Sequence, residues 1–286
     1  MRTLKRAVEQ LRQVLEKLYD KYNHRRFIPP DPLQFLYRYS DFADREVVGF
    51  LSAALAYGRV EQIEKSLNSL FARMGKSPYA FVKNFRKAER EKLSSFKHRF
   101  TTGQDISDLL EILKQVLNDR GSIEAYFLRG YRQTDRNIIP ALSEFSESLL
   151  GIYAKKHGVR ISPGLKYLLV NPSGKSACKR LNLFLRWMVR KDEVDPGLWK
   201  SVDRAKLVVP VDVHIARLCR ILGFYDQKTV SLATAVKITE SFAEIAPADP
   251  VKYDFALSRI GIMDNCDGNY RQYCKNCELL GYCFGG

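Results

Sequence analysis

Four cysteines stand close together in the last part of the sequence, at Cys266, Cys274, Cys277 and Cys283. Seven, two and five residues separate them in turn. Four thiolates at this density can bind one Zn²⁺ ion tetrahedrally or hold the four irons of a 4Fe–4S cluster. Free surface cysteines are the weaker interpretation, because exposed thiols so close together are an oxidation liability. The spacing predicts a metal centre and leaves zinc and iron–sulfur open.

A second stretch, LVVPVDVHIARLCRILGFY from Leu207 to Tyr225, places an acidic residue where a helix should begin. The apolar run up to Pro210 reads as an extended lead-in, and the residues after Asp212 follow a helical pattern. An aspartate at this position either caps the helix or carries out chemistry. His214 is open to the same two interpretations, as a packing residue or a functional one.

The third stretch, NPSGKSACKRLNLFLRWMVRK, begins with a turn signal at Asn171 and continues as a helix. A turn containing Gly174 that leads into a helix presents unpaired backbone N–H groups, which is a geometry suited to a phosphate. The apolar face of the predicted helix is formed by Leu181, Leu183, Phe184, Trp187 and Met188.

Together these stretches resemble the helix-hairpin-helix (HhH-GPD) DNA glycosylase superfamily. The cysteine spacing is similar to the iron–sulfur loop of endonuclease III-type glycosylases, with a first loop one residue longer. The segment Val211-Asp212-x-His214-x-x-Arg217 reproduces the segment that carries the family's essential aspartate. The match lies upstream of the cysteines, in the order that the family has.

The hairpin itself is matched in part. Lys179-x-x-Asn182 reproduces the second half of the family's pattern, whereas Asn171-Pro172-Ser173 replaces Leu-Pro-Gly. The 33 positions from Lys179 to Asp212 are more than endonuclease III has and are closer to the archaeal 8-oxoguanine glycosylases. The chain therefore resembles an uncharacterised branch related to both.

The resemblance implies an all-α fold of two helical lobes with an iron–sulfur loop at the C-terminal side. Residues 33–195 would form a module with the hairpin-like DNA-binding element. Residues 1–32 and 196–286 would form the second lobe, with the essential aspartate and the cysteines. The implied cofactor is a 4Fe–4S cluster on the four cysteines, with one zinc ion as the alternative. The implied partner is double-stranded DNA with a damaged base, bound by a monomer.

The implied reaction is base excision, in which a damaged base, with oxidised purine favoured, is flipped out and its N-glycosidic bond is cleaved. Asp212 would stabilise the positive charge that develops on the sugar. A lysine, Lys179 before Lys175, would attack the anomeric carbon and give the enzyme AP-lyase activity. Without such a lysine, Asp212 would activate water instead.

Further residues are predicted to contact DNA. Tyr57 and Arg59 lie where the family approaches the lesion, and Ala54 replaces the family's glutamine there. The segment around Phe96–Gly103 is basic and aromatic in a non-helical break. The predicted DNA-binding set is Tyr57, Arg59, His98, Arg99, Gly174, Lys175, His214, Arg217, Arg271 and Lys275.

Composition and patterning agree with a helical nucleic-acid binder. Lysine and arginine outnumber aspartate and glutamate by 47 to 32, which gives a formal charge of +15 and favours a polyanionic partner. No membrane span or signal peptide is recognisable, so we expect a cytoplasmic protein. The segment 86–98 is predicted to be mobile surface. Helices are predicted at about 4–22, 33–39, 43–57, 59–74, 77–85, 105–118, 122–129, 136–156, 164–170, 175–191, 211–222, 230–246 and 250–260.

Two other function classes remain open on the sequence. One is a non-catalytic DNA- or RNA-binding protein on the same scaffold, which the altered hairpin and Ala54 favour. The other is a zinc-stabilised helical regulatory or RNA-modifying protein. Metal content separates zinc from iron–sulfur, and covalent trapping on damaged DNA separates an enzyme from a binder.

Overall fold

The protein has an all-α fold, and its only strands within the described residues are two strands of two residues each. The computed structural model describes residues 2–158, 160–264 and 266–283. The α-helices are α1 (Arg2–Tyr22), α2 (Phe42–Ala54), α3 (Val60–Met74), α4 (Pro78–Lys83), α5 (Lys87–Leu93), α6 (Gly103–Arg120), α7 (Ile123–Phe127), α8 (Ile139–His157), α9 (Pro163–Leu168), α10 (Lys179–Val189), α11 (Val213–Ile221), α12 (Leu232–Ile245), α13 (Asp254–Met263) and α14 (Leu280–Cys283).

Shorter elements connect these helices. They are the 3₁₀ turns η1 (Arg25–Phe27), η2 (Pro32–Arg38), η3 (Pro172–Gly174), η4 (Arg204–Lys206) and η5 (Gln272–Asn276), and the antiparallel strands β1 (Lys97–His98) and β2 (Thr101–Thr102). Within the described residues, no helix combines the length and the apolarity that crossing a bilayer requires.

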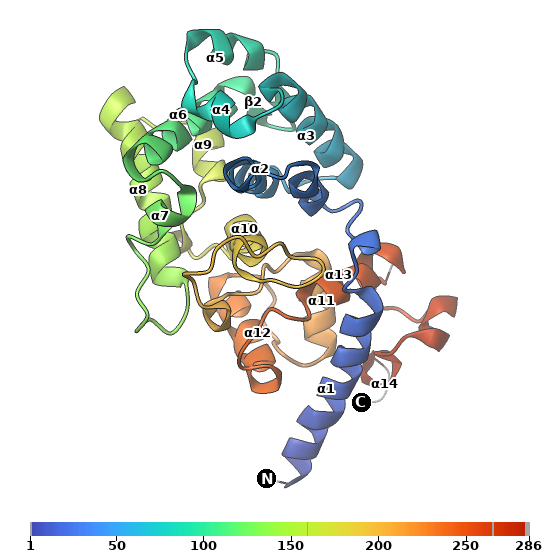
Figure 1. The fold of residues 1–286 in the computed structure, drawn as a ribbon. Coiled ribbons are helices and arrows are strands. Elements are labelled where there is room, and N and C mark those ends of the chain that lie inside the picture. Colours follow the sequence, from blue (N-terminus) through green and yellow to red (C-terminus); the bar gives the residue numbers. More distant parts are fainter. Residues whose placement is uncertain (1, 159, 265, 284–286) are drawn as a thin grey trace.

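The helices form two groups, with α10 between them (Figure 1). In the first group, α6 packs against α4, α5, α7, α8 and α9, and α2 packs against α4. In the second, α13 packs against both α1 and α11, and α1 also contacts α12. Helix α10 packs against α2 of the first group. The chain therefore passes between the groups both before α2 and near α10. Whether the boundary falls at residue 195 stays a prediction.

A buried carboxylate holds α2 against the start of α7. Glu46 is 1% exposed, and its oxygens accept hydrogen bonds from the backbone N–H groups of Ile123 (2.8 Å) and Glu124 (2.7 Å). Trp199 adds a third donor through Nε1 (2.8 Å). A negative charge at a helix N-terminus is favourable, because unpaired N–H groups point outward there. Glu46 therefore joins α2, α7 and the segment after α10.

Most predicted helices are confirmed to within a few residues, and the largest shifts, of four residues, are at the starts of α10 and α13. The pattern predicts a helix from residue 175, but the helix begins at Lys179. Lys175 and Cys178 have left-handed backbone conformations, with φ of 62° and 47°, which a right-handed helix cannot include. The segment 86–98, predicted to be mobile surface, is mostly exposed and contains α5 and β1, which the pattern did not predict.

Candidate functional site

A cleft of about 1080 Å³ lies where the two helix groups meet α10. Its walls come from the α2–α3 connection, α9, the first half of α10, α11, α13 and the loop that follows Cys266. Its described charged lining residues are the basic Lys179, Arg180, Arg186, Arg217, Arg220, Lys228 and Arg259 and the acidic Asp31, Asp212, Asp254 and Asp267. Basic side chains outnumber acidic ones, so the cleft suits an anionic ligand.

Asp212 caps α11 and faces this cleft. One carboxylate oxygen, Oδ1, accepts the backbone N–H groups of His214 (2.9 Å) and Ile215 (2.8 Å). These bonds fix the carboxylate at the positive end of the helix. No hydrogen bond to Oδ2 occurs within the described residues, and the side chain is partly exposed. Asp212 therefore combines the capping role with a carboxylate oxygen available to a ligand.

Lys179 is the first residue of α10 and lines the same cleft. Its Nζ lies 3.4 Å from the carbonyl oxygen of Ala56, at the end of a hydrogen-bonding range. Cys178 precedes it as the N-cap without a side-chain capping bond. Lys175 and Gly174 are both exposed, and neither is among the described residues of the cleft wall. The structure thus brings Lys179, and not Lys175, to the cleft that Asp212 faces.

The floor of the cleft is a set of buried charges that the sequence reading missed. Asp254 is 4% exposed, opens α13 and accepts a hydrogen bond from Arg186. Burial raises the pKa of Asp254 to about 6; Arg186 opposes this rise and the negative charge of Asp212 adds to it. The negative charge of Asp212 therefore acts on Asp254 at the floor of the cleft.

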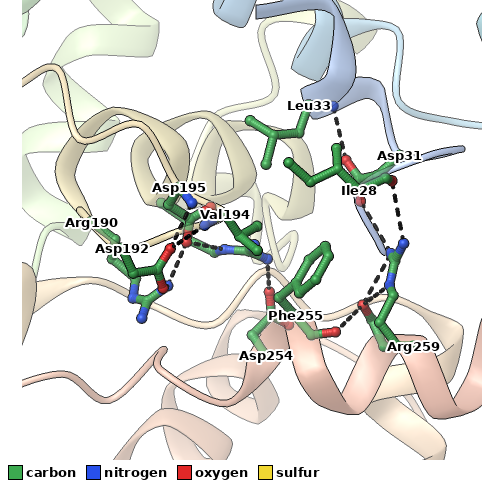
Figure 2. Close-up of polar contacts among 12 residues, drawn as sticks. Ile28, Asp31, Leu33, Arg190, Asp192, Val194, Asp195, Asp254, Phe255 and Arg259 are labelled. Carbon is green, nitrogen blue, oxygen red and sulfur yellow. Dashed lines mark hydrogen bonds and ion pairs between the residues drawn. The ribbon is translucent and has the colours of Figure 1, made fainter. Parts of the chain in front are cut away.

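Arg259 ties the other side of the floor to the segment before η2. This buried guanidinium donates to the carbonyl oxygen of Phe27 at 3.0 Å. It also donates to Asp31 Oδ2 at 3.3 Å (Figure 2). Asp31 also caps η2 by accepting the N–H of Leu33 (2.9 Å). The position of α13 is thereby fixed relative to the loop that leads into η2.

Behind the floor, the charges continue as a buried network. Asp195 is fully buried and accepts two hydrogen bonds from Arg186, at 3.1 and 3.0 Å. It also pairs with Arg190 (Figure 2). The Nε of Arg190 contacts Asp249 at 3.0 Å. Asp192 pairs with Arg190 at 2.9 Å and accepts the N–H groups of residues 194 and 195. The network connects α10, the following loop and the start of α13.

A buried arginine lies on the wall beside Lys179, and no carboxylate pairs with it in the part of the chain that the structure describes. Arg180 is 9% exposed and donates to the carbonyl oxygens of Ala54 (2.8 Å) and Tyr167. Its guanidinium lies 4.0 Å from the ring centroid of Tyr167 and 5.1 Å from that of Tyr57. Burial lowers the pKa of Arg180. The two tyrosines and this cation form the aromatic side of the cleft.

The β1–β2 hairpin corrects one sequence prediction. His98 is completely buried, with Nδ1 2.9 Å from Ser66 Oγ and Nε2 3.0 Å from the carbonyl oxygen of Tyr57. Both ring nitrogens are used inside the protein, and burial lowers its pKa. Contrary to the prediction, His98 is not available to DNA; it fixes the hairpin instead. Arg99 and Arg59 are exposed beside the cleft, as a DNA contact requires.

His214 and Arg217 attach α11 to its neighbours as well as lining the cleft. His214 packs on α13 at Gly261, where an added Cβ would lie 2.4 Å from Nδ1 of the histidine. That nitrogen is buried and has no hydrogen-bond partner within the described residues. Arg217 donates to the carbonyl oxygen of Cys266 and lies against Gly268. His214 and Arg217, both predicted to contact DNA, therefore also hold α11 against its neighbours.

The cysteine-rich segment forms one side of the cleft through Asp267, Gly268 and Asn269. Arg271 is exposed and pairs with Asp267 at 2.8 Å, and Lys275 is exposed. The backbone N–H of Arg271 donates to Cys274 Sγ. The backbone N–H of Asn269 donates to Asp267 Oδ1. The N–H of Asn269 and the guanidinium of Arg271 lower the pKa of Asp267 to about 2.

The four cysteines lie near one another without forming a closed ligand set. Burial raises the pKa values of Cys277 and Cys283, and the charges of Cys266 and Cys274 add to both increases. Within residues 2–158, 160–264 and 266–283, no three His, Cys, Asp or Glu side chains are arranged to hold a metal ion. Four thiolates are suitable ligands for a metal centre, but the four cysteines are not arranged as a ligand set in this structure. Cys178 and Cys219 are buried elsewhere, as predicted.

The fold and the cleft define an all-α protein with a cleft lined mainly by basic side chains among its charged residues. The family described as "Protein of unknown function (DUF2400)" matches residues 31–263, and the chain belongs to this family. No curated protein and no solved structure matches the chain. The matched range contains both Lys179 and Asp212 and ends before Cys266.

Proposed function

We propose that the protein is a base-excision DNA glycosylase with AP-lyase activity. One observation carries the proposal: Lys179 and Asp212, 33 positions apart, both line one basic cleft. An amine and a carboxylate at the same cleft are the groups that a lysine-dependent glycosylase needs. The basic side chains around them favour the phosphates of a nucleic acid.

The reaction would follow from these two groups. A base rotated out of the DNA enters the cleft, and its sugar develops positive charge as the N-glycosidic bond lengthens. The carboxylate of Asp212 stabilises that charge. The Lys179 amine bonds to C1′ as the base leaves, and loss of a proton with opening of the sugar ring gives a Schiff base. Removal of a C2′ proton then expels the 3′ phosphate by β-elimination. Oxidised purine stays the favoured lesion.

Covalent trapping tests the nucleophile. Borohydride reduces the Schiff base, so the wild-type protein should form a stable adduct with duplexes from a panel of damaged bases. Lys179→Gln should abolish the adduct, whereas Lys175→Gln, which changes an exposed lysine outside the described cleft wall, should keep it. The readout is the shifted protein–DNA band on a denaturing gel. An undiminished band with Lys179→Gln would refute the assignment of this nucleophile.

The cysteines are proposed to hold a 4Fe–4S cluster, with one zinc ion as the alternative. Such a centre would tie the segment 266–283 together and thereby support the wall formed by residues 267–269. No step of the reaction above passes through it. The donor set of four cysteines supports this proposal.

Metal analysis tests the proposed 4Fe–4S cluster directly. Purified wild-type protein should be brown and contain iron and sulfide, and Cys277→Ser should be colourless and poorly soluble. Cys178→Ser is the matched control and should stay brown, because Cys178 is a buried cysteine at the start of α10, outside the segment 266–283. Zinc without a visible absorption band would support the alternative. Brown, fully folded Cys277→Ser protein would rule out Cys277 as a ligand.

A non-catalytic nucleic-acid binder is the second candidate, and one observation favours it. Asp212 has an ordinary capping role, and Lys179 Nζ lies near a carbonyl oxygen, so both have structural uses. Such a protein would bind DNA in the same basic cleft. It would release no base and form no borohydride adduct on any lesion.

A further inference from the structure

An exposed phenylalanine stands at the tip of the β1–β2 hairpin. His98 pairs with Thr101 in the ladder, so Arg99 and Phe100 form a two-residue turn between the strands. Arg99 has φ of 53°, the left-handed conformation that tight hairpin turns use. Phe100 is 51% exposed, which is unusual for a side chain of this size and apolarity. The turn therefore presents an aromatic ring and a cation to solvent.

The hairpin is held firmly from below. His98 is buried and bonded through both ring nitrogens. Tyr57 donates its hydroxyl to Thr101 Oγ1 at 2.6 Å, and the carbonyl oxygen of His98 lies 3.0 Å from the same hydroxyl. Asp105 accepts the N–H of Thr102 at 2.9 Å. These bonds fix the base of the turn, so the exposure of Phe100 does not result from a loose loop.

Phe100 extends the aromatic side of the cleft outward. Its ring stacks on that of Tyr57, with centroids 5.2 Å apart and an interplanar angle of 27°. It meets the ring of Tyr167 edge-on at 4.6 Å. Both tyrosines line the cleft, and Arg99 packs on Gly58 at the same rim. An exposed ring thus continues a stack that begins inside the cleft.

We propose that Phe100 is a stacking platform for an unpaired nucleobase, and that the preferred substrate is DNA whose bases are unpaired beside the cleft. This inference rests on the proposed function and specifies the form of DNA that the same site takes. The occupant is a nucleobase because an aromatic platform beside exposed cations binds a base on its face and the adjoining phosphates by charge. Arg99, Arg59 and Lys97 supply those exposed cations near the turn.

Pairing decides whether the platform is usable. In a duplex both faces of each base are covered by its neighbours, so a ring outside the helix gains contact only after a base has been unstacked. A single-stranded segment or a bubble offers uncovered bases without that cost. A platform built on Phe100 therefore favours unpaired DNA, whereas the basic lining of the cleft attracts the phosphates of both forms.

Binding of matched oligonucleotides tests the inference. Fluorescence anisotropy would compare the full-length protein on one labelled DNA strand, on the same strand fully paired, and on a duplex with a central bubble, at one salt concentration. The wild type should bind the single strand and the bubble about tenfold more tightly than the duplex. Phe100→Ala should remove about that factor from the unpaired forms and leave duplex binding unchanged.

Two further variants define the controls. Phe42→Ala removes another exposed phenylalanine, 41% exposed at the start of α2, and should change nothing. Phe100→Trp restores an aromatic face and should keep the preference. Equal loss on all three DNAs in Phe100→Ala, or no loss on any, would overturn the platform. Tighter binding of the wild type to the duplex would overturn the substrate preference.

The outcome also separates this inference from the proposed function. If the protein binds DNA and forms the borohydride adduct but shows no dependence on Phe100, only the platform is refuted. If it binds none of the three DNAs even at low salt, the proposed function fails as well.

Discussion

The Asp212→Asn variant should stay as stable as the wild type and lose base release by about 10²–10³-fold. The structure gives the reason for both parts. Asp212 Oδ1 accepts two backbone N–H groups at the start of α11, and the amide oxygen of asparagine can accept the same bonds. Asparagine and aspartate are about equally good N-caps. The exchange therefore removes the negative charge from the cleft and leaves the helix end intact.

Single-turnover base release and thermal unfolding, measured on the same preparation, check this expectation. Asp212→Ala is the matched comparison, because it removes the charge and the cap together and should also cost about 1 kcal/mol of stability. If Asp212→Asn releases base at the wild-type rate, the carboxylate is only a cap and the binder becomes the better interpretation. If it unfolds, the asparagine has not preserved the helix end and rate comparisons on it are void.

Replacement of Asp195 by alanine should lower the free energy of unfolding by roughly 3–5 kcal/mol. Asp195 is fully buried and forms ion pairs with both Arg186 and Arg190. Its removal leaves two buried guanidinium groups with fewer carboxylate partners, and the cost of an uncompensated buried charge is large. Because Arg186 also contacts Asp254, the floor of the cleft should loosen with the network.

Urea unfolding followed by circular dichroism measures the loss. Asp226→Ala is the control, because Asp226 forms an exposed ion pair with Lys237 and its removal should leave the unfolding midpoint unchanged. Equal midpoints for Asp195→Ala and the wild type would show that the buried network contributes no net stability. The affinity of Asp195→Ala for DNA, compared with that of the wild type, would then report whether the cleft has changed shape.

The helices were accessible from the sequence because their apolar residues recur with the helical period. Leu11, Leu15 and Leu18 repeat at intervals of four and three and are all buried in α1. The start of α10 was not accessible in the same way. Lys175 and Cys178 have left-handed conformations in the turn, and neither residue type favours a positive φ, so the sequence does not predict them.

The candidate site was predictable only in part. Asp212 and Lys179 were found because a motif carries them, and the structure brings both to one cleft. Asp254 and Arg180 were missed, since their importance comes from burial beside residues distant in the chain. The sequence indicated that the segment 96–103 is basic and aromatic, and the prediction assigned DNA contact to His98 and Arg99. Only the hairpin ladder shows that His98 points inward and Phe100 outward.

Gly261 determines how closely two helices approach each other. Helix α11 begins at the cap Asp212, helix α13 begins at Asp254, and the two helices pack together where Gly261 meets the ring of His214. The packing of the two helices that carry the acidic groups therefore includes a position with no side chain. A single methyl group there would lie 2.4 Å from Nδ1 of His214, so the histidine or one of the two helices would have to shift while every charge in the cleft remained in place.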